Sequence, residues 1–180
     1  MPGVLLVIDM LNPYEHEDAD PLKESVMQIV SPLRELIAEA RAHDVPTVYV
    51  NDNHGDWSAA RRELTQRALE GAAPELVEPI APPEGIPFVV KARHSIFYGT
   101  QVDYLLRQAE ADPIVLTGQV TEQCILYSAL DAYVRHFNVV VPRDCVAHIH
   151  PGLAEAALTM MEVNMRARVV DRGIEALRTL

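Results

Sequence analysis

Short β-branched apolar runs alternate with longer amphipathic stretches along the whole chain. This alternation is typical of βαβ units and predicts a parallel sheet. The apolar runs are nearly continuous, as expected for strands that helices cover on both faces. The pattern therefore predicts an α/β fold with three layers, α/β/α, and a central, mostly parallel six-stranded sheet of the Rossmann-like kind. The predicted strands are 4–8, 46–51, 87–91, 113–118, 138–142 and 167–171.

The first long amphipathic stretch predicts a helix over residues 21–43. Asp20-Pro21 and Ser31-Pro32 each resemble an N-cap followed by proline in the first helical turn, so we expect a break near Pro32. The segment 74–87 is rich in proline and predicts a loop or irregular crossover. Further helices are predicted over 59–70, 100–110, 122–136, 152–165 and 173–179. The first helix has a stripe of apolar side chains that we expect to be buried. The stripe comprises Leu33, Leu36, Ile37 and Ala40.

Composition narrows this picture to one domain over residues 1–180, because 180 residues with 49% apolar content suffice for a single core. The net charge of −11, with basic residues scattered among acids, argues against nucleic acid as a partner. There is no stretch of about 20 apolar residues and no basic leader, so we expect neither membrane insertion nor export. The two cysteines indicate reduced thiols and a cytoplasmic protein.

Three chemically complementary residues follow predicted strands. Asp9 ends the first apolar run, Lys91 ends the third, and Cys124 lies where the fourth strand turns into a helix. Taken singly, each has an ordinary structural explanation: a turn cap, a strand edge and a small buried side chain. The carboxyl ends of parallel strands meet at one edge of the sheet, so we expect an acid, an amine and a thiol to lie together there.

These residues stand in motifs that resemble the isochorismatase-like cysteine hydrolases, a family that includes nicotinamidases and N-carbamoylsarcosine amidase. The resemblance spans nearly the whole chain. The matching segments are Leu6-Val7-Ile8-Asp9-Met10, Lys91 with Ser95, Phe97 and Thr100, Gly118-Gln119-Val120-Thr121-Glu122-Gln123-Cys124-Ile125, and Pro142-Arg143-Asp144-Cys145-Val146-Ala147.

The resemblance implies a role for each residue of the set. Cys124 is the nucleophile, Asp9 accepts and donates the proton, and Lys91 is the electrostatic partner of both. The backbone N–H groups of Val120 and Cys124 form the oxyanion hole, with a cis peptide between Gln119 and Val120. An adjacent ammonium and a helix N-terminus are expected to lower the pKa of the thiol below about 8.5.

Nicotinamidases of this family bind a metal through an Asp-x-His pair and a later histidine. Asp52-Asn53-His54 supplies the pair, but no histidine follows before His94. We therefore expect no metal and no other cofactor. His94, His148 and His150 are interpreted as surface or loop residues, and Cys145 as structural.

Residues on the loops after the strands are candidates for the substrate pocket. The aromatic ones could equally pack against neighbours or form a subunit interface. The pocket candidates are Tyr14, Asn51, Trp57, Phe97, Tyr98 and Thr121.

Three functions are compatible with these features. The first is a cysteine-dependent hydrolase that cleaves a C–N bond of a small carboxamide or ureido compound through a thioester. The second is hydrolysis of an isochorismate-like enol ether, in which Asp9 protonates the substrate and Cys124 is a bystander. The third is a non-catalytic ligand-binding module on the same scaffold. The complete Asp9, Lys91 and Cys124 set favours the first. The resemblance also implies a homo-oligomer, a dimer or a tetramer.

Overall fold

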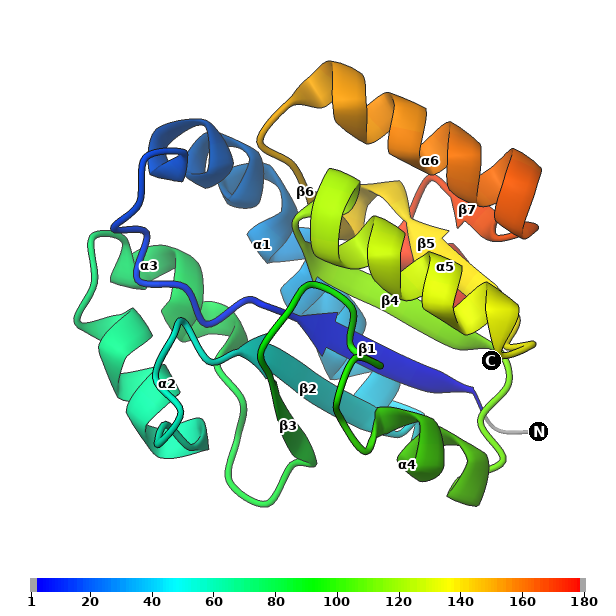
Figure 1. Cartoon of the computed structure of the whole chain (residues 1–180), viewed down its shortest axis with the longest axis horizontal. Coiled ribbons are helices and arrows are strands. Elements are labelled where there is room, and N and C mark those ends of the chain that lie inside the picture. Colours follow the sequence, from blue (N-terminus) through cyan, green and yellow to red (C-terminus); the bar gives the residue numbers. More distant parts are fainter. Residues whose placement is uncertain (1–2, 179–180) are drawn as a thin grey trace.

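The computed structural model describes residues 3–178, in which a central sheet is covered by helices on both faces (Figure 1). Every predicted strand is present, and no end moves by more than one residue. The predicted six-stranded sheet gains a seventh, two-residue strand, β6, which is too short to produce a recognisable hydrophobic pattern. The strands are β1 (Val4–Ile8), β2 (Thr47–Asp52), β3 (Phe88–Lys91), β4 (Ile114–Gln119), β5 (Val139–Pro142), β6 (Val146–Ala147) and β7 (Arg168–Val170).

The strand order is β3-β2-β1-β4-β5-β7, with β6 paired to β4. All of these pairings are parallel. The chain extends the sheet from β1 to β3 in one direction and then returns to the other side of β1 with β4. The strand order thus reverses between β1 and β4, which is where open parallel sheets bind ligands at their carboxyl ends.

Helices connect the strands and include one, α3, inside the predicted 74–87 loop, followed by a 3₁₀ turn. No helix in the described part of the chain is long and apolar enough to cross a membrane. The last helix was predicted to reach residue 179, which lies outside the described residues. The helices are α1 (Ala19–Ala42), α2 (Arg61–Leu69), α3 (Pro74–Val77), α4 (Val102–Gln108), α5 (Leu126–Val134), α6 (Pro151–Met165) and α7 (Gly173–Leu177).

The break predicted near Pro32 is wrong, because α1 runs through this residue without interruption. Its N-cap is Asp18 rather than Asp20, which lies in the first turn and pairs with Lys23 at 2.9 Å. Proline inside a helix costs about 3 kcal/mol. Burial of apolar side chains on both sides of Pro32, including Ile29 and Leu33, offsets this cost.

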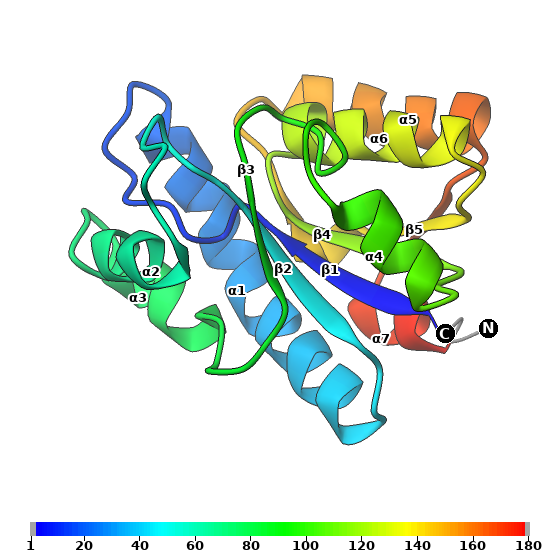
Figure 2. The same ribbon diagram turned by 60° about the horizontal axis from the view of Figure 1, so that its bottom comes forward.

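The core has two layers because successive β1 side chains point to opposite faces of the sheet. Leu5 and Val7 pack in the layer beneath α1, α2, α3 and α7. Leu6 and Ile8 pack in the layer beneath α4, α5 and α6. Figure 2 shows these two groups of helices on either side of the sheet. The strands between them are thereby held rigidly, and so are the residues that follow them.

Candidate active site

The carboxyl ends of β1, β2, β3 and β4 bring the predicted catalytic residues together. Asp9 follows β1, Lys91 ends β3, and Cys124 lies in a π-helical turn, Thr121–Ile125, after β4. The Lys91 Nζ atom is 2.8 Å from Asp9 Oδ2 and 3.6 Å from Cys124 Sγ. An ammonium therefore stands between a carboxylate and a thiol, as the strand positions predicted.

Lys91 is the centre of this cluster, and its side chain has no solvent exposure. Besides Asp9 and Cys124 it contacts Asp52, whose Oδ2 atom is 3.4 Å from Nζ. Burial alone lowers the pKa of Lys91, but the charges of Asp9, Cys124 and Asp52 outweigh it and raise the pKa above its ordinary value. Lys91 is therefore a fixed positive charge rather than a proton donor at neutral pH.

The backbone and both carboxylate oxygens of Asp9 are held in place. Its φ is +56°, a left-handed conformation that is uncommon for residues other than glycine. Oδ1 accepts the backbone N–H of Asp52 at 2.7 Å, while Oδ2 faces Lys91. The Gln119 side chain donates to the Asp9 carbonyl at 2.6 Å. These bonds orient the carboxylate toward the ammonium and the thiol.

The environment of Cys124 differs from the expected first turn of an α-helix. The Val120 carbonyl accepts the N–H groups of Gln123 and Ile125, and the latter is the i to i+5 bond of a π-helix. The peptide bond between Gln119 and Val120 is cis. The expected fall in thiol pKa is wrong: burial and the Asp9 charge raise the pKa of Cys124, outweighing Lys91 and the Val120 N–H. The resting thiol is thus protonated and needs a base.

Glu122, a buried carboxylate to which the sequence analysis gave no role, anchors the π-helical turn that carries Cys124. Glu122 Oε1 accepts the backbone N–H groups of Ile149 and His150, at 3.0 and 2.7 Å, where α6 begins. Thr121 Oγ1 donates to the Ala147 carbonyl of β6 at 2.9 Å. The turn that carries Cys124 is therefore tied to β6 and α6.

His94 was interpreted as a surface or loop residue, and it is exposed, but it also contacts Cys124. Its Nδ1 atom is 3.9 Å from Cys124 Sγ. Its ring packs against Tyr127, with centroids 5.2 Å apart. The only sequence signal was its position three residues after Lys91, which a pattern of strand ends does not distinguish from an ordinary loop position.

Three of the six pocket candidates are buried and bonded within the protein. Tyr14 O–H lies 3.5 Å from Gln119 Oε1, and burial raises the pKa of Tyr14 to about 12. Asn51 exchanges two hydrogen bonds with the backbone of Leu11, at 2.9 and 3.1 Å. Thr121 bonds to β6, as described above. These side chains hold the loops around the site.

The other three candidates are aromatic and lie in different settings. Phe97 is buried and stacks on Phe137, with centroids 5.9 Å apart. Trp57 is 84% exposed, beyond the β2 loop. Tyr98 lines a hollow of about 280 Å³, here termed the His94 hollow because it shares His94 with the surroundings of Cys124. The His94 hollow is lined by Arg93, His94, Ser95, Tyr98, Tyr127 and Asp131.

The residues that resemble a metal-binding pair do not fit a metal. His54 Nε2 is 2.9 Å from the Leu11 carbonyl, and Asp52 uses one oxygen for Lys91 and the other for the His54 N–H. Within residues 3–178, no three His, Cys, Asp or Glu side chains are grouped so as to hold a metal ion.

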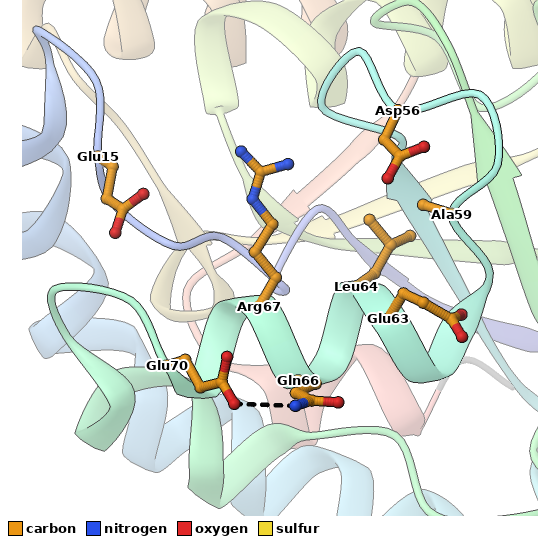
Figure 3. Close-up of a pocket in the computed structure, with 8 residues that line it drawn as sticks. All are labelled: Glu15, Asp56, Ala59, Glu63, Leu64, Gln66, Arg67 and Glu70. Carbon is orange, nitrogen blue, oxygen red and sulfur yellow. Dashed lines mark hydrogen bonds between the residues drawn. The ribbon is translucent and has the colours of Figure 1, made fainter.

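A larger hollow, of about 460 Å³, lies between α2 and the loops that carry Glu15 and Asp56 (Figure 3). Arg67 projects from α2 among acidic side chains, and Gln66 donates to Glu70 at 2.9 Å. None of Asp9, Lys91 and Cys124 lines this hollow. It is a solvated, charged surface rather than part of the cysteine site.

The family model described as the Isochorismatase domain matches residues 3–173. The chain belongs to the isochorismatase family. A relative of the same family, the uncharacterized protein YaaI of Bacillus subtilis (strain 168), is 34% identical over 158 residues, which cover 88% of this chain and 87% of YaaI.

Two further proteins to which the chain is similar are named for an activity. Maleamate amidohydrolase of Pseudomonas putida is 28% identical over 162 residues, which cover 86% of this chain and 76% of that enzyme. The crystal structure of N-carbamoylsarcosine amidase from Thermoplasma acidophilum superposes with a TM-score of 0.74 at 28% identity, covering 96% of this chain and 97% of that one. The fold is therefore the one this family shares.

Proposed function

We propose that the chain is a cysteine-dependent hydrolase that cleaves a C–N bond of a small carboxamide or ureido compound. The observation that carries the proposal is the position of Lys91 Nζ, 2.8 Å from Asp9 and 3.6 Å from Cys124. A carboxylate and a thiol held by one buried ammonium form a base and a nucleophile within reach of each other. Two relatives named above are amide hydrolases, which supports the same reaction class.

The geometry supports the following steps. Because the pKa of Cys124 is raised, the thiol must lose its proton as it attacks, and Asp9 accepts it. Sγ then bonds to the carbonyl carbon, and the oxyanion is stabilised by the N–H groups of Val120 and Cys124, each worth about 3 kcal/mol. Asp9 returns the proton to the departing nitrogen, the C–N bond breaks, and a thioester remains. Water hydrolyses the thioester.

The proposal is tested by measuring ammonia release from a panel of small carboxamides and ureido compounds. Native protein and a Cys145→Ala control should be active on the same compounds, because Cys145 is fully buried and its thiol donates to Asp144 at 3.3 Å. Cys124→Ala should lose at least about 10³-fold, as expected for a missing nucleophile. Unchanged ammonia release in Cys124→Ala would contradict the proposed role of the thiol.

A further inference from the structure

Glu122 lies just before Cys124 in the sequence, and its carboxylate is buried but only half satisfied by hydrogen bonds. The residue is 9% exposed. Oε1 accepts two backbone N–H groups, those of Ile149 and His150. Oε2 is buried and has no hydrogen-bond partner among the residues that the structure describes. Burying a carboxylate oxygen without a donor is unfavourable. Stability alone therefore does not account for a carboxylate at this position.

The carboxylate of Glu122 connects the π-helical turn to the start of α6. The N-cap residue of α6 is His150, whose side chain makes no capping hydrogen bond. Glu122 supplies an acceptor there from a different element, and the positive end of the helix dipole favours a carboxylate at that place. α6 is itself held against the sheet by buried side chains that include Leu158 and Met161. It is therefore a rigid support for the turn.

The chain between β6 and α6, to which Glu122 bonds, is fixed at other points as well. β6 pairs with β4 directly before the turn. The side chain of Thr121 bonds to β6. The His148 N–H donates to Ser25 Oγ of α1 at 3.0 Å. Glu122 is the last of these links before Cys124.

The position of the π-helical turn decides where the proposed oxyanion-hole donors point. These donors, the N–H groups of Val120 and Cys124, lie on either side of Glu122 in the sequence. The Val120 N–H bonds to the Cys124 thiol and so already faces the sulfur. Such donors act only within about 2.7–3.1 Å of the oxyanion. A displacement of about 1 Å can lower a rate about 10²-fold.

We propose that Glu122 is a positioning residue, which holds the Val120 and Cys124 N–H groups in place for the oxyanion by fixing the turn to the start of α6. The inference rests on the proposed function. Glu122 contacts no reacting atom in it and transfers no proton. Its loss should therefore slow reactions of Cys124 that pass through an oxyanion, and spare reactions of the same thiol that do not.

Two reagents separate these cases. With 4-nitrophenyl acetate, the C–S bond forms, an oxyanion develops, the ester C–O bond breaks and 4-nitrophenolate leaves in a burst, while Asp9 accepts the thiol proton. With iodoacetamide, the sulfur of Cys124 displaces iodide from a CH₂ carbon and no oxyanion forms. Absorbance of 4-nitrophenolate measures the first reaction, and peptide mass spectrometry of Cys124 measures the second.

Glu122→Met removes the acceptor and keeps a side chain of similar length. Its burst rate should fall by roughly 10-fold to 10²-fold, whereas alkylation of Cys124 should not slow. Glu122→Gln retains an oxygen that can accept both N–H groups, so its burst rate should stay within about three-fold of native. Glu162→Met is the matched control on α6: Glu162 is exposed, and both reactions should be unchanged.

Three results would overturn the assignment of Glu122: an unchanged burst in Glu122→Met, equal slowing of both reactions, or the same loss in Glu122→Gln as in Glu122→Met. Circular dichroism checks that each variant is folded. If Glu122→Met is not, Glu122→Asp takes its place, because it withdraws the carboxylate by one methylene group. Its burst rate should fall about 10-fold without slower alkylation. A native burst rate in Glu122→Asp would then overturn the assignment.

Failure of the underlying function gives a different result. If native protein shows no burst, or if Cys124→Ala shows the same burst, no thioester forms on Cys124 and both proposals are wrong. If the native burst depends on Cys124 while Glu122→Met retains the native burst rate, only the assignment of Glu122 is wrong.

Discussion

At the residue scale, the single ammonium of Lys91 contacts two carboxylates and a thiol. Lys91 lies near Asp9, Asp52 and Cys124, so its positive charge is already balanced before a thiolate forms. A third negative charge in this buried site, on Cys124, is unfavourable. Burial and the Asp9 charge therefore outweigh the lowering effect of Lys91, and the pKa of the Cys124 thiol is raised.

The opposite effects of Asp9 and Lys91 on the thiol lead to a prediction. Asp9→Asn should speed alkylation of Cys124 by iodoacetamide at about pH 8, because removing the Asp9 charge lowers the pKa of the thiol and increases its thiolate fraction. Lys91→Met should slow alkylation, since the neighbouring positive charge is lost. Both variants should lose turnover. Labelling is measured by peptide mass spectrometry.

Cys145 is the internal control for this experiment. It is fully buried, and burial together with Asp144 raises its pKa, so its labelling should stay slow in all three proteins. A slower reaction of Cys124 in Asp9→Asn would contradict the electrostatic description of the site.

At the element scale, β1 and β4 approach each other too closely at one point for any side chain. Gly118 is paired with Ile8 and has a φ of +107°. A Cβ atom at Gly118 would lie 2.0 Å from the Ile8 carbonyl oxygen. Glycine is therefore required at position 118, close before the π-helical turn that carries Cys124. Its partner Ile8 directly precedes Asp9.

Gly118→Ala should lower the free energy of unfolding by about 3 kcal/mol or more, because both the backbone conformation and the strand spacing are disturbed. It should also reduce turnover, since Asp9 and Cys124 are displaced relative to each other. Gly152→Ala is the matched control: no atom lies within 4 Å of its added Cβ, and it should stabilise α6 by about 0.5–1 kcal/mol. Urea unfolding measures the first effect, and ammonia release from small carboxamides and ureido compounds measures the second. Similar stability in the two variants would refute the close contact.

At the scale of the whole molecule, five buried side chains have raised pKa values. Burial raises the pKa of Tyr14 and Tyr49 to about 12, and it is also the largest cause of the raised pKa values of both cysteines. The pKa of Lys91 is raised as well. In each case the folded protein retains a proton that the unfolded chain releases at lower pH.

The free energy of unfolding should therefore fall on the alkaline side. Unfolded thiols titrate near about pH 8.5 and unfolded tyrosines near about pH 10. Above those values the unfolded chain binds fewer protons than the folded one, so stability decreases as pH rises. The thiol contribution is complete below about pH 8.5, and the tyrosine contribution is lost between about pH 10 and 12.

Urea unfolding at several values between about pH 7 and 11 measures this decline. A Cys124→Ala, Cys145→Ala double variant should show a smaller decline near the lower end of that range, because the two raised thiol pKa values are gone. A constant free energy of unfolding up to about pH 11 would show that these groups titrate alike in both states.

The hydrophobic pattern by itself determined the succession of strands and helices along the chain. It also determined the edge of the sheet at which Asp9, Lys91 and Cys124 meet. It could do so because side-chain periodicity and strand direction are local properties that place strand ends without knowledge of distances. The same local reasoning predicted a break in α1 at Pro32, but packing against the core keeps the helix continuous there. It also overlooked β6, whose two residues make no pattern.

Only the tertiary structure decided what surrounds each reacting atom. The contact of His94 with the thiol, the Glu122 anchor and the raised pKa of Cys124 all depend on loops that are distant in sequence and close in space. Electrostatic and hydrogen-bonding energies vary steeply with distance and burial. Neither quantity can be read from the amino-acid sequence. Local sequence patterns thus predict that Asp9, Lys91 and Cys124 lie together, whereas the burial and the contacts of these side chains depend on the folded structure.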